Sequence, residues 1–313
     1  MSAELLRPIL LLLICIQPVA ADISRYSTLI VADPPNRAPR AEAVRVTYFG
    51  TNGYRLETAG HSILIDPYFT RISFARAALG WPIHPDRARI EASVPNGMAD
   101  AILATHGHFD HLLDAPILMH KTGAQLIGSE TAMQLARRAG VPPSKCKTVL
   151  SRKSLTIGPW RIDVLPASHD RVPFMGVPFN GPLKGTAPPA RAGDWVCGEP
   201  LSYLITANGF KIFVDSGGTT EVLPSAKVGP IDLAILGVAL PDSRARFAAT
   251  VKRLRPRYIL PSHQDNFFLP LERGFQFGLL SDFSFVRREH ERQHLPGRLI
   301  LLDYFRPWTL PHS

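Results

Sequence analysis

The eight residues 104–111, Ala-Thr-His-Gly-His-Phe-Asp-His, constrain this chain more than any other stretch. They hold three imidazoles and one carboxylate, and they directly follow the apolar run 101–103. Leu112 and Leu113 then begin a helical pattern, so the stretch indicates a strand, a tight polar loop and the start of a helix. Burying so many polar groups is costly unless they are satisfied together. Metal coordination explains the cluster best, because divalent ions such as zinc bind histidine nitrogen and carboxylate oxygen.

The spacing within this loop suggests two ions. His106 and His108 are two residues apart, so in an extended loop both rings can point to one side and share one ion. Asp110 and His111 follow where the chain turns into a helix, so they can reach a second ion nearby. A cluster of solvated loop histidines is the alternative interpretation.

The His-x-His-x-Asp-His pattern resembles the signature of the metallo-β-lactamase superfamily of hydrolases, and the elements at 44–305 follow that family's order. The resemblance implies an α/β fold, a four-layer αββα sandwich in which helices flank two mixed sheets. The opening strands and Ile65-Asp66-Pro67 look closest to the branch with ascorbate-6-phosphate lactonase and N-acylphosphatidylethanolamine phospholipase D. That branch typically has Gly-His after the first strand, where this chain has Gly50-Thr51.

The resemblance also implies three ligands outside the loop, each just past a predicted strand. His169 would join the ion of His106 and His108, and His263 would join the ion of Asp110 and His111. Asp215 would bridge both ions, and the small residues 216–218 after it would let the backbone turn away. The implied metal ligands are His106, His108, Asp110, His111, His169, Asp215 and His263.

Two further carboxylates could support this ligand set. The resemblance implies that Asp66 holds the metal loop without binding an ion, whereas a solvated aspartate at a strand end is the alternative. Histidine ligands need hydrogen-bond acceptors that fix their tautomers, and Asp66 or Asp114 could provide them.

The implied chemistry is hydrolysis at two divalent cations, with Zn²⁺ expected and Mn²⁺ or Fe as alternatives. Two such ions can share a water and lower its pKa towards about 7. The metal-bridged hydroxide would attack an ester-type bond in a phosphodiester, phospholipid-like or lactone substrate, and Asp110 would orient or shuttle the proton. The alternative function is a non-catalytic metal-binding or scaffold protein that keeps the hydrolase fold.

The N-terminal residues predict export. Arg7 precedes the apolar run 9–16, and small residues at 19 and 21 permit cleavage after Ala21, so 1–21 is predicted to be a signal peptide. The protein would then be periplasmic or secreted, with membrane anchoring through an uncleaved leader as the alternative. Residues 22–43, with Pro34, Pro35 and Pro39, predict an extended arm, and 44–313 the hydrolase domain.

Charge and cysteine content limit the partners. The formal net charge of +9 favours a small-molecule or lipid-like anionic substrate, and it leaves open contact of the Arg-rich arm with a membrane surface. The basic residues are scattered and form no stripe interleaved with aromatics, so no nucleic-acid partner is expected. After cleavage of the leader, Cys146 and Cys197 could pair in an oxidising compartment or stay as two buried thiols.

A second zinc-like pattern, His-Glu-x-x-His, occurs at 290–294. It is typical of zinc proteases when it lies on a helix. Here its neighbours are charged, Pro296 and Gly297 end any helix at once, and no third ligand is evident. We therefore expect a solvated helix there. His61, His84, His120 and His312 are expected to be structural or exposed.

Hydrophobic periodicity and turn residues predict the remaining elements. Two long loops are expected, at 68–97 with one short helix and at 171–200, whose aromatic residues suggest a substrate wall or simple packing over the core. Helices are predicted at 112–121, 129–140 and 242–254, and strands at 44–49, 54–58, 62–65, 101–103, 125–127, 148–150, 160–165, 201–206, 210–214, 231–236, 257–260 and 299–302.

Overall fold

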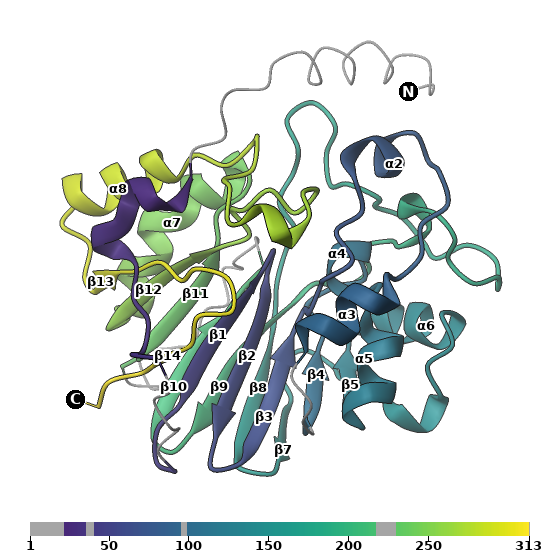
Figure 1. The fold of residues 1–313 in the computed structure, drawn as a ribbon, viewed down its shortest axis with the longest axis horizontal. Helices are drawn as coiled ribbons and strands as arrows, with labels where there is room; N and C mark the ends of the chain where they lie inside the picture. Colours follow the sequence, from purple (N-terminus) through teal and green to yellow (C-terminus); the bar gives the residue numbers. More distant parts are fainter. Residues whose placement is uncertain (1–21, 36–40, 95–98, 217–229, 313) are drawn as a thin grey trace.

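The computed structural model describes residues 22–35, 41–94, 99–216 and 230–312. Two seven-stranded sheets face each other, and helices cover their outer faces (Figure 1). The predicted four-layer αββα sandwich is therefore confirmed. No helix in these ranges is long and apolar enough to cross a membrane. The predicted signal peptide, 1–21, lies outside the described residues.

The first sheet starts with an antiparallel meander and continues with parallel strands. β1, β2 and β3 pair antiparallel, and β3 to β6 pair parallel. In spatial order its strands are β14 (Trp308–Thr309), β1 (Arg45–Gly50), β2 (Gly53–Thr58), β3 (His61–Ile65), β4 (Ala101–Leu103), β5 (Gln125–Gly128) and β6 (Cys146–Thr148).

The second sheet has the same plan. β7 to β10 pair antiparallel and β10 to β13 pair parallel. Asn208 and Gly209 form the predicted turn between β9 and β10, both with positive φ. In spatial order its strands are β13 (Arg298–Leu299), β12 (Tyr258–Ser262), β11 (Leu233–Gly237), β10 (Phe210–Val214), β9 (Leu201–Ala207), β8 (Trp160–Pro166) and β7 (Ser154–Ile157).

Helices cover the outer face of each sheet. The second sheet is covered by α7 (Pro241–Leu254) and α8 (Phe283–Arg292). Ser129 caps α6 as predicted, because its side chain accepts a hydrogen bond from the Ala132 amide. The helices on the side of the first sheet are α2 (Phe74–Ala78), α3 (Arg87–Ser93), α4 (Phe109–Leu112), α5 (Ala115–Thr122) and α6 (Glu130–Arg138).

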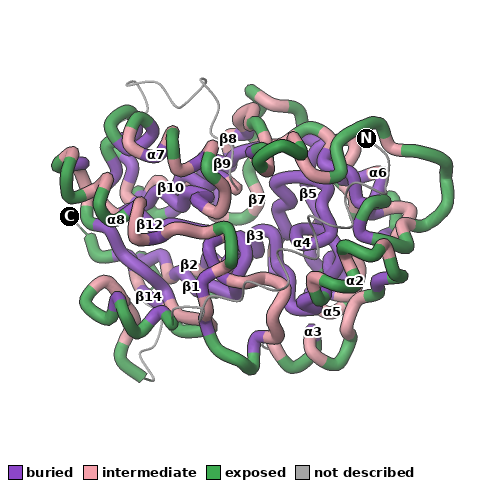
Figure 2. The backbone as a smooth tube through the Cα atoms, turned by 90° about the horizontal axis from the view of Figure 1, so that it is seen from above, coloured by how far each residue is buried: buried purple, intermediate pink, exposed green. Residues whose placement is uncertain are grey.

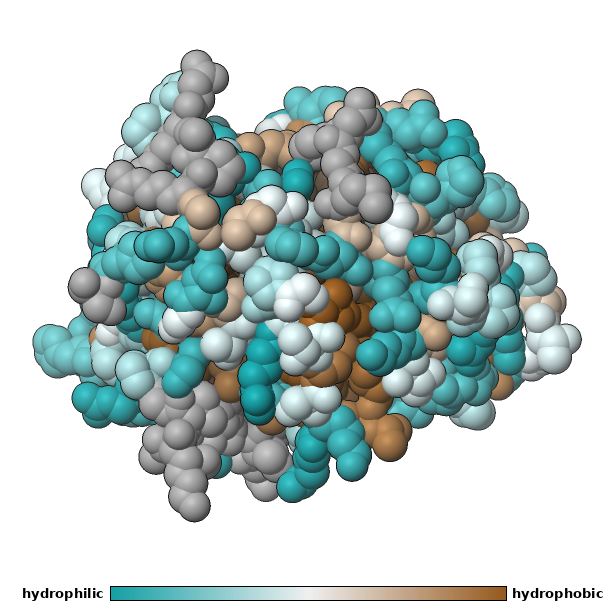
Figure 3. Space-filling view, turned by 90° about the horizontal axis from the view of Figure 1, so that it is seen from below, coloured by the Kyte–Doolittle hydropathy of each residue, from teal (hydrophilic) through white to brown (hydrophobic). Residues whose placement is uncertain are grey.

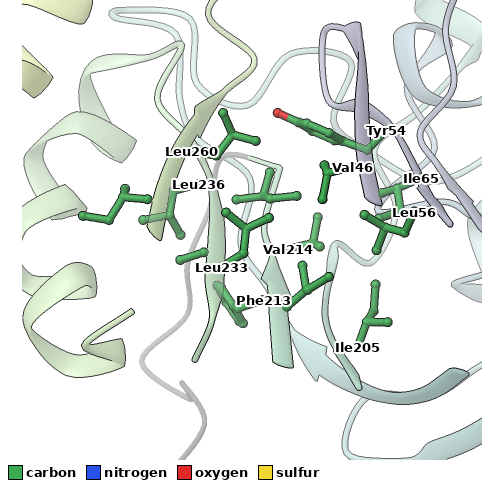
Figure 4. Close-up of a cluster of buried hydrophobic side chains, with 14 of the residues drawn as sticks. Val46, Tyr54, Leu56, Ile65, Ile205, Phe213, Val214, Leu233, Leu236 and Leu260 are labelled. Atoms are coloured by element: carbon green, nitrogen blue, oxygen red, sulfur yellow. The ribbon is translucent and has the colours of Figure 1, made fainter. Parts of the chain in front are cut away.

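The core between the sheets follows from strand alternation. In β3, Ile63 and Ile65 point into the inter-sheet core, whereas Leu64 packs with the helix-side cluster. Figure 4 shows side chains of the first sheet, such as Leu56, facing side chains of the second, such as Val214. Burial of both faces gives strands with nearly continuous apolar sequence.

Five strands end at the same edge of this sandwich, because β3 and β4 run parallel in one sheet and β8, β10 and β12 run in one direction in the other. The residues that follow these ends include all the predicted ligands. Figure 2, which looks onto this edge, shows buried backbone through the middle and exposed loops around the rim. The opposite face is largely polar, with one hydrophobic area near its centre (Figure 3).

Several predicted elements differ from the structure. The helix expected at 112–121 is split into α4 and α5, loop 68–97 holds two short helices, and strand β7 was not predicted. The strand expected at 148–150 lies at Cys146–Thr148. Cys146 and Cys197 are both free thiols.

The predicted extended arm is also different where it is described. Ile23–Leu29 forms the 3-10 helix η1, and its Tyr26 is buried against Phe277 and Phe283. Ile30 then bridges to Leu301. The segment packs on the domain because its apolar side chains are buried there. The sequence prediction relied on the prolines and gave too little weight to these apolar residues.

Candidate metal centre

The loop after β4 is held tightly against the segment 196–197. The Gly107 amide donates to the Cys197 carbonyl oxygen at 2.9 Å. A Cβ atom at position 107 would lie 2.3 Å from the Val196 carbonyl oxygen, so only glycine allows this approach. The loop then enters α4, with His108 at the N-cap position. This geometry brings Asp110 and His111 back beside the first two histidines.

Three histidines form one potential ligand group. His106, His108 and His169 each offer one ring nitrogen, and these nitrogens lie within 4.8 Å of one another. His106 Nε2 is 2.9 Å from His108 Nδ1. His106 and His108 are buried, and His169 is half-buried after β8. We refer to them as the three-histidine group.

The other ring nitrogen of each histidine contacts the protein. His108 Nε2 donates to the Pro178 carbonyl oxygen at 2.9 Å, and His169 Nδ1 donates to the Asp170 carbonyl oxygen at 2.7 Å. Because a carbonyl oxygen only accepts, these bonds leave lone pairs on His108 Nδ1 and His169 Nε2. His106 Nδ1 lies 3.3 Å from Ser216 Oγ. Each ring is therefore oriented as metal-binding histidines usually are.

A second group consists of Asp110, His111 and His263, and we refer to it as the aspartate group. Its three ligand atoms also lie within 4.8 Å of one another. Asp110 Oδ2 is 3.4 Å from His111 Nε2 and 3.2 Å from His263 Nε2. The His263 Nδ1 atom is buried and has no hydrogen-bond partner among the described residues.

Asp66 lies directly beneath the loop. It is fully buried, and its carboxylate accepts from the Thr105 amide at 2.7 Å, the Thr105 hydroxyl at 2.5 Å and His111 Nδ1 at 2.8 Å. The structure thus places Asp66 where it fixes both the loop backbone and the His111 tautomer. Its backbone has a φ of 40° and that of His263 a φ of 54°. Left-handed backbone at non-glycine residues is strained, and such strain is concentrated at functional sites.

A series of hydrogen-bonded side chains connects Asp66 to the second sheet, and the sequence analysis did not predict it. Asn52 Nδ2 donates to Asp66 at 2.9 Å, and Ser262 Oγ donates to Asn52 Oδ1 at 2.7 Å. The Tyr54 hydroxyl donates to Ser262 Oγ at 2.9 Å. The His263 amide donates to the Thr51 carbonyl oxygen at 2.8 Å. In the sequence, only the polar turn residues 50–53 and the serine beside His263 could have indicated this network.

A buried ion pair reinforces the same junction. Arg71 donates to Asp265 at 2.8 Å and to the Phe49 carbonyl oxygen at 2.9 Å. Asp265 also accepts from the hydroxyls of Tyr48 and Tyr304. Burial alone would raise the pKa of Asp265, but the charge of Arg71 and the hydrogen bond from Tyr304 hold it below its usual value. The loop that carries His263 is therefore tied to the turn between β1 and β2.

Electrostatics keeps the three-histidine group neutral. Burial and the neighbouring imidazole of His169 lower the pKa of His108 to about 3. Burial likewise lowers the pKa of His169 to about 4, and burial with the surrounding imidazoles lowers that of His106. Neutral imidazole is the form that binds metal.

The aspartate group is charged instead. Burial would lower the pKa of His111, but the carboxylates of Asp110 and Asp66 raise it to about 10. Burial would raise the pKa of Asp110, yet His111 and His263 hold it well below its usual value. Binding of an ion through His111 Nε2 would therefore displace a proton. Both groups fit divalent ions, because nitrogen and carboxylate donors converge, and every ring except that of His263 has an orienting partner on its other nitrogen.

Two further aspartates, Asp215 and Asp114, were predicted to bind or support the metal ions. Asp215 is buried directly after β10, with its amide bonded to the Ile235 carbonyl oxygen, but it belongs to neither group of three. Its bridging role stays a prediction, and 217–218 lie outside the described residues. The Asp114 carboxylate instead accepts from the Phe69 amide and from the Thr70 amide and hydroxyl, so these bonds tie it to the loop 68–97.

The pattern at 290–294 forms no metal site among the described residues. His290 lies on α8, where Nε2 donates to the Gly297 carbonyl oxygen, and His294 is exposed beyond the helix. Glu291 pairs with Arg287 at 2.8 Å. The expectation of a solvated helix agrees with this geometry.

Comparison with known proteins gives one family. A family model described as the β-lactamase superfamily domain matches residues 45–263. A UPF0173 metal-dependent hydrolase of Heliobacterium modesticaldum is 28% identical over 234 residues, covering 72% of this chain and 84% of the relative.

Solved structures have the same fold. Igni18, described as a novel metallo hydrolase from Ignicoccus hospitalis, matches with a TM-score of 0.54 and 17% identity, over 87% of this chain and all of that one. The metallo-β-lactamase fold protein YhfI of Bacillus subtilis matches with a TM-score of 0.55 and 16% identity, over 85% of this chain and 99% of that one.

Proposed function

The chain belongs to the β-lactamase superfamily, and from this premise we propose that it is a metal-dependent hydrolase that cleaves an ester-type bond. The observation that carries the proposal is the pair of adjacent ligand groups at one edge of the sandwich. The UPF0173 relatives are likewise described as metal-dependent hydrolases.

Each group would hold one divalent cation, Zn²⁺ in the first instance, with Mn²⁺ or Fe as alternatives. When bound, such a pair of ions supplies Lewis acidity and a water whose pKa is lowered towards about 7. The ligands would be His106, His108 and His169 for one ion and Asp110, His111 and His263 for the other, with Asp215 between them.

Two of the chain's own carboxylates have further roles in this proposal. Asp110 stays ionised at neutral pH, because its pKa is lowered by His111 and His263, so its carboxylate can bind a cation and orient a proton through a hydrogen bond. Asp66 holds His111 through Nδ1, which directs Nε2 towards Asp110. No serine or cysteine nucleophile is required.

Aromatic side chains beside both groups favour a substrate with an apolar part. The Phe179 ring lies 6.0 Å from the His108 ring, and the Phe267 ring lies 5.2 Å from the His263 ring. Together with the net charge of +9, they support a small or lipid-like anionic substrate, such as a phosphodiester, a phospholipid-like ester or a lactone. We also propose export to the periplasm or medium, on the strength of residues 1–21.

The test combines metal analysis with a panel of phosphodiester, phospholipid and lactone substrates. Wild type and a matched variant, His290→Ala, are expected to bind metal and turn over one substrate class. His108→Ala should lose the ion of the three-histidine group and turnover together. Equal turnover in wild type and His108→Ala would refute the proposal. Full metal content with no turnover on any class would favour the alternative of a non-catalytic metal-binding protein.

A further inference from the structure

A cavity of about 540 Å³ lies on the helix side of the first sheet, outside the metal centre. It is bounded by α3, α5, the end of α6 and residues from the loop 171–200. None of its lining residues is one of the seven predicted ligands. Its apolar walls come from Ile83, Leu113, Ile117, Pro188, Pro189 and Trp195.

The polar lining of this cavity is basic. His84, Arg87, His120 and Arg138 line it, and no carboxylate does. Arg87 pairs with Glu91 at 3.2 Å on the exposed surface. Arg138 donates to the Lys184 carbonyl oxygen at 3.0 Å, which is a neutral acceptor. The guanidinium charge of Arg138 is therefore available to an anion.

Trp195 is one of the lining residues, and it is only 1% exposed. It adds a buried aromatic residue to the apolar part of the lining.

We propose that this cavity binds a small organic anion with an apolar body, such as an aromatic carboxylate or sulfonate. Its volume is within the range of small-molecule sites, which combine mostly apolar walls with a few convergent polar groups. The apolar body would lie against Ile117 and Leu113, and the anionic end would face Arg138. An inorganic anion would leave the apolar walls uncovered, and an uncharged analogue would leave the guanidinium unpaired.

This site is connected to the metal loop through the backbone on both of its sides. Leu113 directly follows α4, which carries Asp110 and His111. The residues after Trp195 hold the Gly107 amide. A ligand in the cavity would thus contact two of the segments that position the metal ligands. The binding itself can be tested without any hydrolysis assay.

The experiment is calorimetric titration of the full-length protein with naphthalene-1-sulfonate. The comparison ligands are uncharged 1-naphthol and inorganic sulfate. We expect saturable binding of the sulfonate at one site per chain. Each comparison ligand should bind about tenfold more weakly or not at all, because charge-assisted bonds and apolar burial both contribute. Absence of sulfonate binding, or equal affinity for all three ligands, would overturn the proposal.

Two neighbouring arginines provide a matched pair of variants. Arg138→Gln removes the charge at the cavity and should weaken sulfonate binding about tenfold. Arg137→Gln makes the same change of charge one residue away, where the side chain pairs with Glu130 and does not line the cavity. It should bind as wild type does. Equal affinities in both variants, or equal losses, would contradict the assignment.

A third variant tests the cavity rather than the charge. Ile117→Trp should fill it and abolish binding, while the unfolding midpoint shows whether the protein remains folded. A folded Ile117→Trp protein that binds the sulfonate as wild type does would place the ligand elsewhere. If Ile117→Trp does not fold, the arginine pair alone decides.

Discussion

The three-histidine group and the aspartate group lie side by side, but the protein holds them in different ways. The three-histidine group is oriented by backbone carbonyls, including that of Pro178 in the long loop 171–200. The aspartate group is oriented by the carboxylate of Asp66 and by a buried chain of side chains that joins the two sheets. One position depends on the path of a loop, and the other on a network of polar side chains.

Their charges differ as well. Burial makes the three-histidine group a neutral set of nitrogen donors, whereas the aspartate group combines an ionised carboxylate with a histidine whose pKa is raised. The same ion would therefore face different competition from protons at the two positions. The comparison predicts that mutations can affect one position without the other.

Removing one ligand from each group should give the largest contrast. We expect His169→Ala and His263→Ala each to keep about one of about two ions per chain, because the remaining group is complete. Metal analysis after dialysis measures this directly. Loss of both ions from either variant would show that the groups do not bind independently.

Replacing Asp66 should destabilise the aspartate group more than any other change behind the ligands. Asp66→Ala leaves His111 and the Thr105 donors buried without their acceptor. We expect the free energy of unfolding to fall by about 3–5 kcal/mol in urea titrations. Asp66→Asn keeps one carbonyl acceptor and should cost less. A loss below about 1 kcal/mol for the alanine variant would contradict the assigned role.

The pH dependence of stability should differ at Asp114, a buried carboxylate that, in the described part of the chain, forms no hydrogen-bonded pair with a histidine such as His111. Burial raises the pKa of Asp114 to about 6. The folded state then binds a proton more tightly than the unfolded state, whose pKa is about 3.9. This contribution is fully present at low pH and is lost as pH rises to about 6, by up to about 3 kcal/mol.

Asp114→Asn lacks this proton equilibrium. The difference in unfolding free energy between wild type and Asp114→Asn should therefore be greatest at acid pH and shrink towards neutrality. Urea titrations at several pH values would measure it. A difference that grows with pH would mean that the donors of residues 69 and 70 favour the ionised form more than burial disfavours it.

The smallest effects should come from the groups behind the ligands, and they should be selective. Ser262→Ala interrupts the chain to Asp66 and should weaken metal binding at the aspartate group by about 10–100-fold. Phe179→Ala removes the ring beside His108 and should weaken the three-histidine group by less, about threefold. Stepwise metal titration separates the two sites. Equal effects of both variants on both sites would remove the distinction between the groups.

The sequence predicted the fold and the identity of the candidate ligands because both leave local signals. Strand alternation and turn residues such as Asn208-Gly209 depend on nearby positions only. The loop 104–111 holds four candidate ligands in eight residues. The order of strands then pointed to His169 and His263 through the family resemblance.

The remaining structure could not be predicted, because it depends on distant partners. The carbonyl of Pro178 has no residue-specific signal, although it orients His108. The bond between Ser262 and Asn52 spans 210 positions, and both residue types are common in ordinary turns. The packing of Tyr26 depends on aromatic residues near the other end of the chain.

The pairing of β14 with β1 has a consequence for biosynthesis. Arg45 and Val46 pair on their outer side with Thr309 and Trp308, which come far later in the sequence. During translation the outer side of β1 therefore stays uncovered until residues 308–309 have been synthesised. Contacts so far apart in sequence form slowly, and an unpaired strand edge can associate with other chains in the meantime.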